Sequence, residues 1–261
     1  MREKLSDVTF IIPIRLETVV RLENLLLSIK YIQKYFSTNI LVLEAAEYNN
    51  GFIKKLVGKQ VKYHFEEDRD SVFYRTKYLN LMTDMATSAY LAIWDSDVII
   101  PKEQIIYAIK KLRDNTVDMI YPYDGHFYDT SDPIRELYIK TKNEKVLFRN
   151  VLKMDLPYGS NMVGGAFMVN KNSYIESGKE NEDFYGWGPE DGERFFRWRN
   201  IGMRVEHGIG NLYHLSHPRG MNSGFRSENQ RSHTLKELSR MEQSSKEEIL
   251  THLRNKNRKD I

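Results

Sequence analysis

Cysteine is absent from the 261-residue chain, so disulfide bonds and thiolate metal sites are excluded. Any bound metal ion must therefore use oxygen or imidazole ligands. Long apolar runs are also missing, since none approaches the roughly 18–20 residues of a transmembrane helix. The N-terminal segment has no small-residue cleavage site and is typical of a first strand, not of a secretory signal. These absences predict a globular protein in a reducing, cytoplasmic compartment.

The composition is that of an ordinary folded protein, with 41% hydrophobic and 12% aromatic residues, which excludes disorder across the whole chain. The 39 basic and 36 acidic residues leave a net charge of +3, which requires no nucleic-acid partner. Residues 194–261 are more basic, with 14 basic and 7 acidic side chains. We expect a solvated helical tail there, and peripheral association with an anionic membrane surface stays open as the alternative.

Hydrophobic periodicity predicts strands that alternate with helices along most of the chain. The strands are expected at 8–14, 40–43, 61–65, 89–94, 117–121, 164–169, 203–206 and 212–214. The helices are expected at 16–36, 51–57, 74–88, 102–113, 172–177, 189–200 and 229–259, with an inserted loop at 122–154 that contains a helix near 133–148. This alternation predicts an α/β fold whose central sheet is mostly parallel.

Trp94-Asp95-Ser96-Asp97 ends an apolar strand, and parallel strands present ligand-binding groups at their carboxyl ends. Two carboxylates separated by one residue can share a divalent cation such as Mg²⁺ or Mn²⁺, together with phosphate oxygens. An acidic loop without a metal is the alternative interpretation, because this short motif is frequent by chance. The position at a strand end favours the metal site.

Gly186-Trp187-Gly188-Pro189-Glu190-Asp191 is a second cluster of unusual composition. The two acids fall in the first turn of a predicted helix, where they would also offset the helix dipole. Helix capping does not explain a tryptophan between two glycines, whose flat apolar face suits a sugar ring. We therefore favour a binding site over a simple cap.

His214 and His217 follow the last predicted strand. A single histidine is more often structural than a metal ligand, but imidazole is the obvious nitrogen ligand in a chain without cysteine. His214 directly follows the strand, so we expect it to complete the metal site and His217 not to do so.

Four segments, which occur in a fixed order, resemble a known family. They are Phe73-Tyr74-Arg75-Thr76-Lys77-Tyr78-Leu79-Asn80, Trp94-Asp95-Ser96-Asp97-Val98-Ile99-Ile100-Pro101, Gly164-Gly165 and Gly186-Trp187-Gly188-Pro189-Glu190-Asp191. Over about residues 8–220 the chain resembles nucleotide-sugar glycosyltransferases of GT-A fold. It is most similar to β-1,4-galactosyltransferases, the catalytic domain of polypeptide N-acetylgalactosaminyltransferases and bacterial chondroitin-type polymerases.

The resemblance implies a role for each matching residue. Asp191 would be the catalytic base, and Glu190 would bind sugar hydroxyls. The residues implied to contact the UDP-sugar are Pro13, Ile14, Arg15, Arg75, Asp95, Trp187 and Gly188. The implied ligands of Mn²⁺, or of Mg²⁺, are Asp95, Asp97 and His214, with Asp97 the more direct of the two carboxylates.

Two positions depart from the family pattern. Pro189 stands where the family has a second glycine after the tryptophan, which puts the hinge of that loop in doubt. Gly192 stands where an acid often follows Asp191, which puts a third carboxylate role in doubt.

The expected protein is therefore an inverting glycosyltransferase that moves galactose, N-acetylgalactosamine or a related hexose from a UDP-sugar to a saccharide or lipid-linked oligosaccharide. Synthesis of a bacterial capsule or surface polysaccharide is the expected setting, at the inner face of the membrane. Residues 1–228 would form the catalytic domain, and residues 229–261 a helical extension packed on it. The alternatives are a nucleotidyltransferase, which would need a glycine-rich phosphate loop near residues 10–15, and a non-catalytic carbohydrate-binding module, which would leave the paired carboxylates unexplained.

Overall fold

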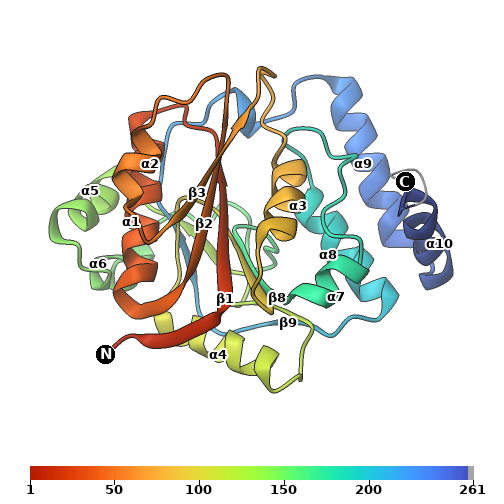
Figure 1. The fold of residues 1–261 in the computed structure, drawn as a ribbon, viewed down its shortest axis with the longest axis horizontal. Coiled ribbons are helices and arrows are strands. Elements are labelled where there is room, and N and C mark those ends of the chain that lie inside the picture. The colour runs from red at the N-terminus through yellow and green to blue at the C-terminus, as the bar shows by residue number, and fades with distance from the viewer. Residues whose placement is uncertain (258–261) are drawn as a thin grey trace.

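The molecule is organised around a seven-stranded sheet, shown by a computed structural model that describes residues 1–257 (Figure 1). The strand order is β3-β2-β1-β4-β8-β6-β9, and only β8 runs antiparallel to its neighbours β4 and β6. The strands are β1 (Glu3–Ile14), β2 (Phe36–Ala46), β3 (Lys62–Glu67), β4 (Tyr90–Trp94), β6 (Met119–Tyr121), β8 (Ala166–Asn170) and β9 (Val205–His207). The predicted α/β fold with a mostly parallel sheet is confirmed.

Strand β1 is the spine of the sheet, because it pairs in parallel with both β2 and β4. Its apolar run Val8–Ile14 is almost completely buried, as expected for a parallel strand that is covered on both faces. The strand begins five residues earlier than predicted, because Glu3–Leu5 pair with the start of β2 before an irregularity ahead of Thr9. Burial alone could not reveal this part, since its side chains are mostly exposed.

Helices cover both faces of this sheet (Figure 1). Helices α1 and α2 lie on one flank, while α3, α7 and α8 lie on the other, and α4 lies at the lower end in that view. Their bounds are α1 (Val19–Tyr35), α2 (Phe52–Val57), α3 (Arg75–Met85), α4 (Lys102–Arg113), α7 (Lys171–Glu176) and α8 (Glu190–Ile201). Among residues 1–257, no helix combines the length and the hydrophobicity needed to span a bilayer.

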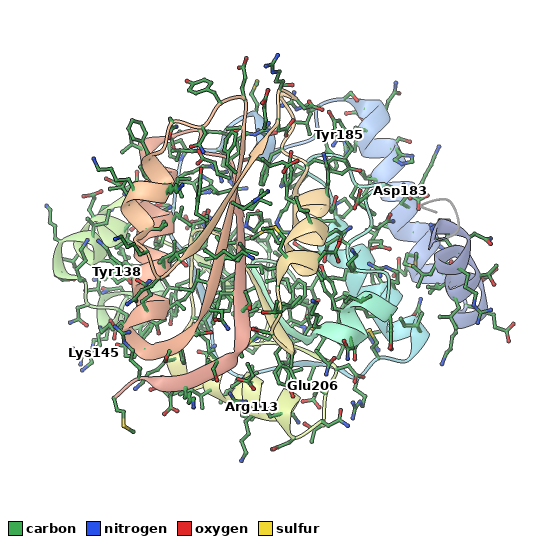
Figure 2. The ribbon with its side chains drawn as sticks, in the orientation of Figure 1. Arg113, Tyr138, Lys145, Asp183, Tyr185 and Glu206 are labelled. Carbon is green, nitrogen blue, oxygen red and sulfur yellow. The ribbon has the colours of Figure 1, made fainter. Side chains whose placement is uncertain are left out.

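A second, three-stranded sheet lies beside the main one and was not predicted. It has the order β5-β10-β7, made by β5 (Val98–Ile99), β10 (Leu212–His214) and β7 (Phe127–Asp129). The helix expected near 133–148 is two helices, α5 (Asp132–Thr141) and α6 (Lys145–Arg149), followed by a 3₁₀ turn at Val151–Lys153. The region expected to be an inserted loop is therefore mostly structured, and Tyr138 and Lys145 in Figure 2 mark its two helices.

The C-terminal extension consists of two helices, α9 (Glu228–Gln243) and α10 (Lys246–Asn257), and not of the single predicted helix. The chain breaks at Ser244–Ser245. There the Ser245 hydroxyl accepts from the backbone N–H of Glu248, and the Glu248 carboxylate accepts from the backbone N–H of Ser245. This reciprocal pair is a capping box, which starts a new helix. The end of the predicted helix, after residue 257, lies outside the described residues.

The extension packs on α8, but through fewer residues than the sequence pattern indicated. Thr234, Met241 and Ile249 are buried, whereas Leu235 of the predicted apolar stripe is 43% exposed. The extension holds only part of the basic balance: residues 229–261 have 8 basic and 5 acidic side chains, which is +3 of the +7 over residues 194–261. Arg194 and Arg197 belong to α8 and are buried against Glu180 and Glu193. The charge argument for a membrane-binding tail is therefore weakened, and membrane association of the tail stays a prediction.

We expect Met241→Ala to lower the free energy of unfolding by about 2–5 kcal/mol, because it removes a fully buried side chain from the α8–α9 contact. Leu235→Ala on the exposed side of the same helix is the matched control and should cost less than about 1 kcal/mol. Urea denaturation monitored by circular dichroism measures both. Equal losses for the two variants would contradict this packing.

Candidate active site

A cavity of about 450 Å³ opens where the carboxyl ends of β1 and β4 meet the N-terminal ends of α3 and α8. Most of the predicted site residues line it, although they come from segments far apart in the sequence. They are Pro13, Arg75, Asp95, Asp97, Trp187, Gly188, Glu190, Asp191 and His214. The sheet topology thus brings the four motifs together.

Ile14 and Arg15 are the two predicted nucleotide contacts that do not line the cavity. Ile14 is 1% exposed because it lies within the parallel ladder beside Glu44 of β2. The Arg15 guanidinium pairs with Asp68 and donates to the carbonyl of Ala45 at 3.1 Å. A nucleotide contact through either side chain therefore has no support in this geometry, and of this segment only Pro13 borders the cavity.

Asp97, His214 and His217 form a compact group in which the possible ligand atoms lie within 4.8 Å of one another. The Nε2 atom of His214 lies 3.5 Å from Asp97 Oδ1, and the Nε2 atom of His217 lies 3.2 Å from Asp97 Oδ2. One carboxylate with two imidazoles is a donor set that suits Mn²⁺ and other first-row divalent cations. The residues present fit a divalent cation.

His217 was expected not to complete the metal site, yet the structure places it in this group beside His214. After β10 the chain turns back instead of continuing away from the sheet. Asn24 donates to the carbonyl of Leu215 at 2.8 Å, and the backbone N–H of Ser216 donates to the Thr130 hydroxyl at 2.9 Å. These long-range contacts bring His217 as near to Asp97 as His214 is, and no local pattern around residues 214–217 could show them.

The charges within this group support one another. Burial by itself raises the pKa of Asp97, but the two imidazoles outweigh it and hold the pKa well below its usual range. For His214, burial lowers the pKa, yet Asp97 and Asp129 raise it to about 10. Without a cation, the protonated His214 thus balances the buried carboxylate. A bound cation would replace that proton.

Asp129 on β7 is a site residue that the sequence did not reveal. Its Oδ1 lies 2.9 Å from Nδ1 of His214, because β7 and β10 pair with Asp129 opposite His214. A carboxylate on Nδ1 fixes the ring orientation and leaves Nε2 free for a metal ion. Nothing in the local sequence of residues 127–129 distinguishes this half-buried aspartate from the acids of an ordinary surface loop.

Asp95 lies outside the group of Asp97, His214 and His217. Its Oδ1 accepts a hydrogen bond from Arg75 at 2.7 Å, and its backbone N–H donates to the carbonyl of Gly165. Burial raises the pKa of Asp95, an effect that Arg75 opposes and Asp97 reinforces. The geometry therefore links Asp95 first to Arg75, and its predicted role as a metal ligand stays a prediction.

Glu190 and Asp191 begin α8 and face the same guanidinium, with Arg75 Nη1 3.9 Å from Glu190 Oε1 and 3.8 Å from Asp191 Oδ1. Asp191 also accepts from the fully buried Arg194 at 2.6 Å. Gly164 makes room for this carboxylate, since a Cβ at Gly164 would lie 2.6 Å from Asp191 Oδ2. These contacts hold Asp191 rigidly and leave it about a quarter exposed to the cavity.

Glu190 differs from its neighbour in protonation. Burial raises the pKa of Glu190 to about 8, the negative charge of Asp191 adds to the effect, and Arg75 opposes it. Its Oε2 atom is buried without a hydrogen-bond partner in the described part of the chain. Glu190 is therefore largely protonated at neutral pH, where its carboxyl can both donate and accept a hydrogen bond.

The loop before α8 presents Trp187 to the cavity. Gly186 has φ +83°, a conformation that favours glycine, whereas Gly188 has an ordinary backbone. Trp187 is 39% exposed and meets Phe225 edge to face, with ring centroids 4.8 Å apart. Pro189, one departure from the family pattern, is the residue that precedes the helix. Figure 2 shows Tyr185, from the same loop, beside α9.

Other cavity residues also escaped the sequence analysis. They are Arg21, Phe127, Tyr158, Met162, Arg219, Asn222 and Phe225, among others. Asn222 accepts from the backbone N–H of Phe73 at 2.9 Å and donates to Glu17 at 2.6 Å, so the segment after His217 is tied to the segments around residues 17 and 73. Gly192, the other departure, lies beside Leu238 of α9, where a Cβ would come within 3.3 Å.

We expect Asp97→Ala to abolish binding of Mn²⁺ and Asp129→Ala to weaken it by about 10–100-fold, the usual cost of losing a carboxylate behind a histidine ligand. Asp129→Asn should recover much of the loss, because an amide oxygen still accepts from Nδ1. The spectrum of free Mn²⁺ in electron paramagnetic resonance measures binding without any substrate. Asp124→Ala is the matched control, since Asp124 pairs with His126 and does not belong to the group. Unchanged affinity in Asp97→Ala would remove this site.

We expect Glu190→Gln to stabilise the protein without metal and nucleotide, increasingly so as the pH rises. The folded protein binds a proton on Glu190 up to about pH 8, whereas the unfolded chain loses it near pH 4.5. Between these values unfolding releases a proton, so the stability of the wild type falls as pH rises, while the neutral glutamine has no such dependence.

Thermal unfolding from pH 4 to pH 9 measures this difference. The melting temperatures should agree near pH 4 and differ by at least about 2–4 °C above pH 8, the change that roughly 1 kcal/mol causes in a chain of this size. A difference that shrinks with rising pH would contradict a protonated Glu190.

Comparison with known proteins agrees with this geometry. A family model described as the N-terminal domain of galactosyltransferase matches residues 146–218, which contain the Trp187 loop, Glu190, Asp191 and both histidines. A search among curated proteins finds no match.

Solved structures with the same fold are numerous, and three illustrate the relation. The catalytic domain of Drosophila β1,4-galactosyltransferase 7 in complex with xylobiose has a TM-score of 0.58 at 18% identity, covering 90% of this chain and 80% of its own. A mutant of the same enzyme with manganese, UDP-Gal and xylobiose has a TM-score of 0.55 at 16% identity, covering 87% and 78%.

The third is the mannosyltransferase PcManGT from Pyrobaculum calidifontis in complex with GDP-Man and Mn²⁺. It has a TM-score of 0.52 at 17% identity, with 82% of this chain and 58% of the mannosyltransferase covered. At these identities the structures establish the fold, while the family match covers the segment with the acidic pair and the histidines. The chain has the fold of these glycosyltransferases, and its segment 146–218 matches the galactosyltransferase family model.

Proposed function

We propose that this protein transfers galactose, N-acetylgalactosamine or a related hexose from a UDP-sugar to a hydroxyl of a saccharide, with inversion at the anomeric carbon and dependence on Mn²⁺. One observation supports this most strongly: the Asp97–His214–His217 group and the Glu190–Asp191 pair face the same cavity. The first suits a cation that binds a diphosphate, and the second suits proton transfer from an acceptor. A structurally similar galactosyltransferase was crystallised with manganese and UDP-Gal.

The donor side of the reaction needs positive charge at the diphosphate. A divalent cation held by Asp97, His214 and His217 would stabilise the negative charge that develops on the departing nucleoside diphosphate. Arg75 lines the same cavity, and its buried Nη1 has no hydrogen-bond partner in the described part of the chain. In this proposal Arg75 donates to the donor substrate, and its bond to Asp95 keeps the guanidinium in place.

The acceptor side needs a base. Asp191 would take the proton of the attacking hydroxyl, while Arg194 holds its carboxylate in one orientation. The hydroxyl oxygen forms the new bond to the anomeric carbon as the bond to the diphosphate oxygen breaks. A single displacement of this kind needs no second nucleophile. The protonated Glu190 would bind a sugar hydroxyl beside it.

Aromatic side chains at the opening of the cavity favour a carbohydrate acceptor. Trp187 and Tyr158 are 39% and 44% exposed, and both line the cavity. Flat, half-exposed rings offer apolar surface to a sugar ring at little entropic cost. In this proposal the acceptor is a saccharide or a lipid-linked oligosaccharide of a bacterial surface polysaccharide or capsule, and the enzyme acts in the cytoplasm at the inner face of the membrane. We further propose residues 1–228 as the catalytic unit and the rest as its helical extension.

The direct test is release of UDP from a series of UDP-sugars, with Mn²⁺ and a panel of saccharide acceptors. Turnover with UDP-galactose or UDP-N-acetylgalactosamine that stops when a chelator removes Mn²⁺ is the expected result. Binding of saccharides without turnover of any UDP-sugar would favour a carbohydrate-binding module instead.

We expect Asp191→Asn to lower turnover by about 10²-fold or more while leaving the binding of UDP and Mn²⁺ unchanged, because it removes only the proton acceptor. Glu190→Gln should raise the KM for sugar substrates as well as lower turnover. Steady-state kinetics and calorimetric titration with UDP measure the two effects. If Asp191→Asn keeps near-normal turnover and Glu190→Gln loses it with donor affinity intact, the two roles must be exchanged.

A further inference from the structure

Helix α2 and the residues before it present an apolar surface that the core does not need. Tyr48, Phe52 and Leu56 are 71%, 57% and 49% exposed, and Phe52 and Leu56 lie one turn apart on the helix. The inner side of α2 is filled by Ile53 and Val57, which are buried. We define the α2 face as Tyr48, Phe52 and Leu56 together with the exposed lysines Lys54, Lys55 and Lys59.

Local hydrogen bonds hold this face in its exposed position. The backbone N–H of Gly51 donates to the Asn49 side chain, and that of Phe52 donates to the Asn50 side chain, both at 2.9 Å. The Tyr63 hydroxyl of β3 also donates to Asn49 at 3.2 Å. The segment is therefore an ordered turn that displays Tyr48 and Phe52, and burial inside the protein does not account for either ring.

The charged side chains of this segment are mostly basic. Between residues 47 and 60 the chain has three lysines and a single acid, Glu47. None of the three lysines forms an ion pair within the described residues. Exposed aromatic and aliphatic side chains flanked by unpaired lysines match the interface of a bilayer that contains anionic lipids, where rings enter the headgroup layer and lysines contact phosphates.

The face also lies near the edge of the sheet that carries the cavity. The α2 segment follows the carboxyl end of β2, which pairs directly with β1, and Pro13 at the end of β1 lines the cavity. Figure 1 shows α2 on the same flank as α1. At the start of α1, Val19 is 71% exposed two residues before the cavity residue Arg21.

We propose that the α2 face binds an anionic membrane surface and holds the cavity close to the lipid headgroups. Helix α2, and not the C-terminal extension, is then the membrane-binding element. Binding itself needs no catalysis. The consequence that the acceptor sugar is linked to a lipid rests on the proposed transferase function.

Sedimentation with vesicles tests the binding without substrate or metal. We expect the full chain to sediment with vesicles of phosphatidylcholine and phosphatidylglycerol at a ratio of about three to one, and at least about threefold less with phosphatidylcholine alone. Phe52→Ser with Leu56→Ser should lower the bound fraction about threefold or more, as should a triple change of Lys54, Lys55 and Lys59 to Gln. High salt should release the wild type.

Matched controls distinguish binding through the α2 face from effects of net charge or of exposed apolar side chains elsewhere on the surface. Lys110, Lys140 and Lys236 are exposed on α4, α5 and α9, and changing all three to Gln alters the net charge equally. Tyr107→Ser removes a 40% exposed ring from α4, whose end is tied by Arg113 to Asp7 near the opposite end of β1. Arg113 lies at the lower edge in Figure 2. Both controls should sediment like the wild type.

Three results would overturn the proposal: no sedimentation of the wild type with anionic vesicles, unchanged sedimentation of both α2 variants, or an equal loss in the controls. UDP binding in the presence of Mn²⁺ is measured on the same variants. Loss of vesicle binding with intact UDP binding supports the α2 face. Failure of UDP binding in the wild type would count against the proposed donor but would not affect the conclusion about vesicle binding.

Discussion

The pairing of β5 with β10 is the contact on which the site depends. These two short strands set His214 opposite Val98, and the backbone N–H of Leu215 donates to the carbonyl of Asp97 at 2.7 Å. More than 100 residues separate the partners, so the pair forms only if the loop-closure cost is offset elsewhere. Buried Ile99, Tyr213 and Leu215 supply apolar contacts at that point, in a cluster with α5 and α6. Apolar packing therefore stabilises the small sheet, and the small sheet positions the three possible metal ligands.

The buried guanidinium of Arg194 positions the carboxylate of Asp191, as the small sheet positions the possible metal ligands. Arg194 is fully buried between Glu180 at 2.8 Å and Asp191 at 2.6 Å, and it lies over the ring of Phe167. A buried ion pair gives little net stability, but an uncompensated partner costs about 3–5 kcal/mol. The carboxylate of Asp191 therefore has one favourable position. Arg75 repeats this arrangement with Asp95, Glu190 and Asp191. Both Arg75 and Glu190 line the cavity, and Nη1 of Arg75 and Oε2 of Glu190 have no hydrogen-bond partner among the described residues.

The predictions from sequence held where local pattern and tertiary structure agree. Helix α4 has the predicted bounds because its apolar spacing and Pro101 are local features. The prediction of one continuous C-terminal helix was wrong. The sequence there is polar and weakly periodic, and a capping box at Ser245 starts a second helix. The family resemblance assigned Ile14 and Arg15 to the nucleotide. In the structure Ile14 is buried and Arg15 pairs with Asp68, so neither side chain lines the cavity, and their contact with a nucleotide stays a prediction.

The sequence by itself determined the alternation of strands and helices, the acidic pair after β4, the Trp187 loop and the exclusion of thiolate chemistry, because each is a property of neighbouring residues. The tertiary structure decided which of these groups meet. It added His217 and Asp129 to His214, since the turn at residues 215–216 and the register of β7 depend on contacts with α1 and with Thr130. It also separated Asp95 from the possible metal ligands, because Arg75 competes for that carboxylate across the cavity. A sequence pattern gives the spacing of residues along the chain but not the register of paired strands. The positions of the site residues depend on that register.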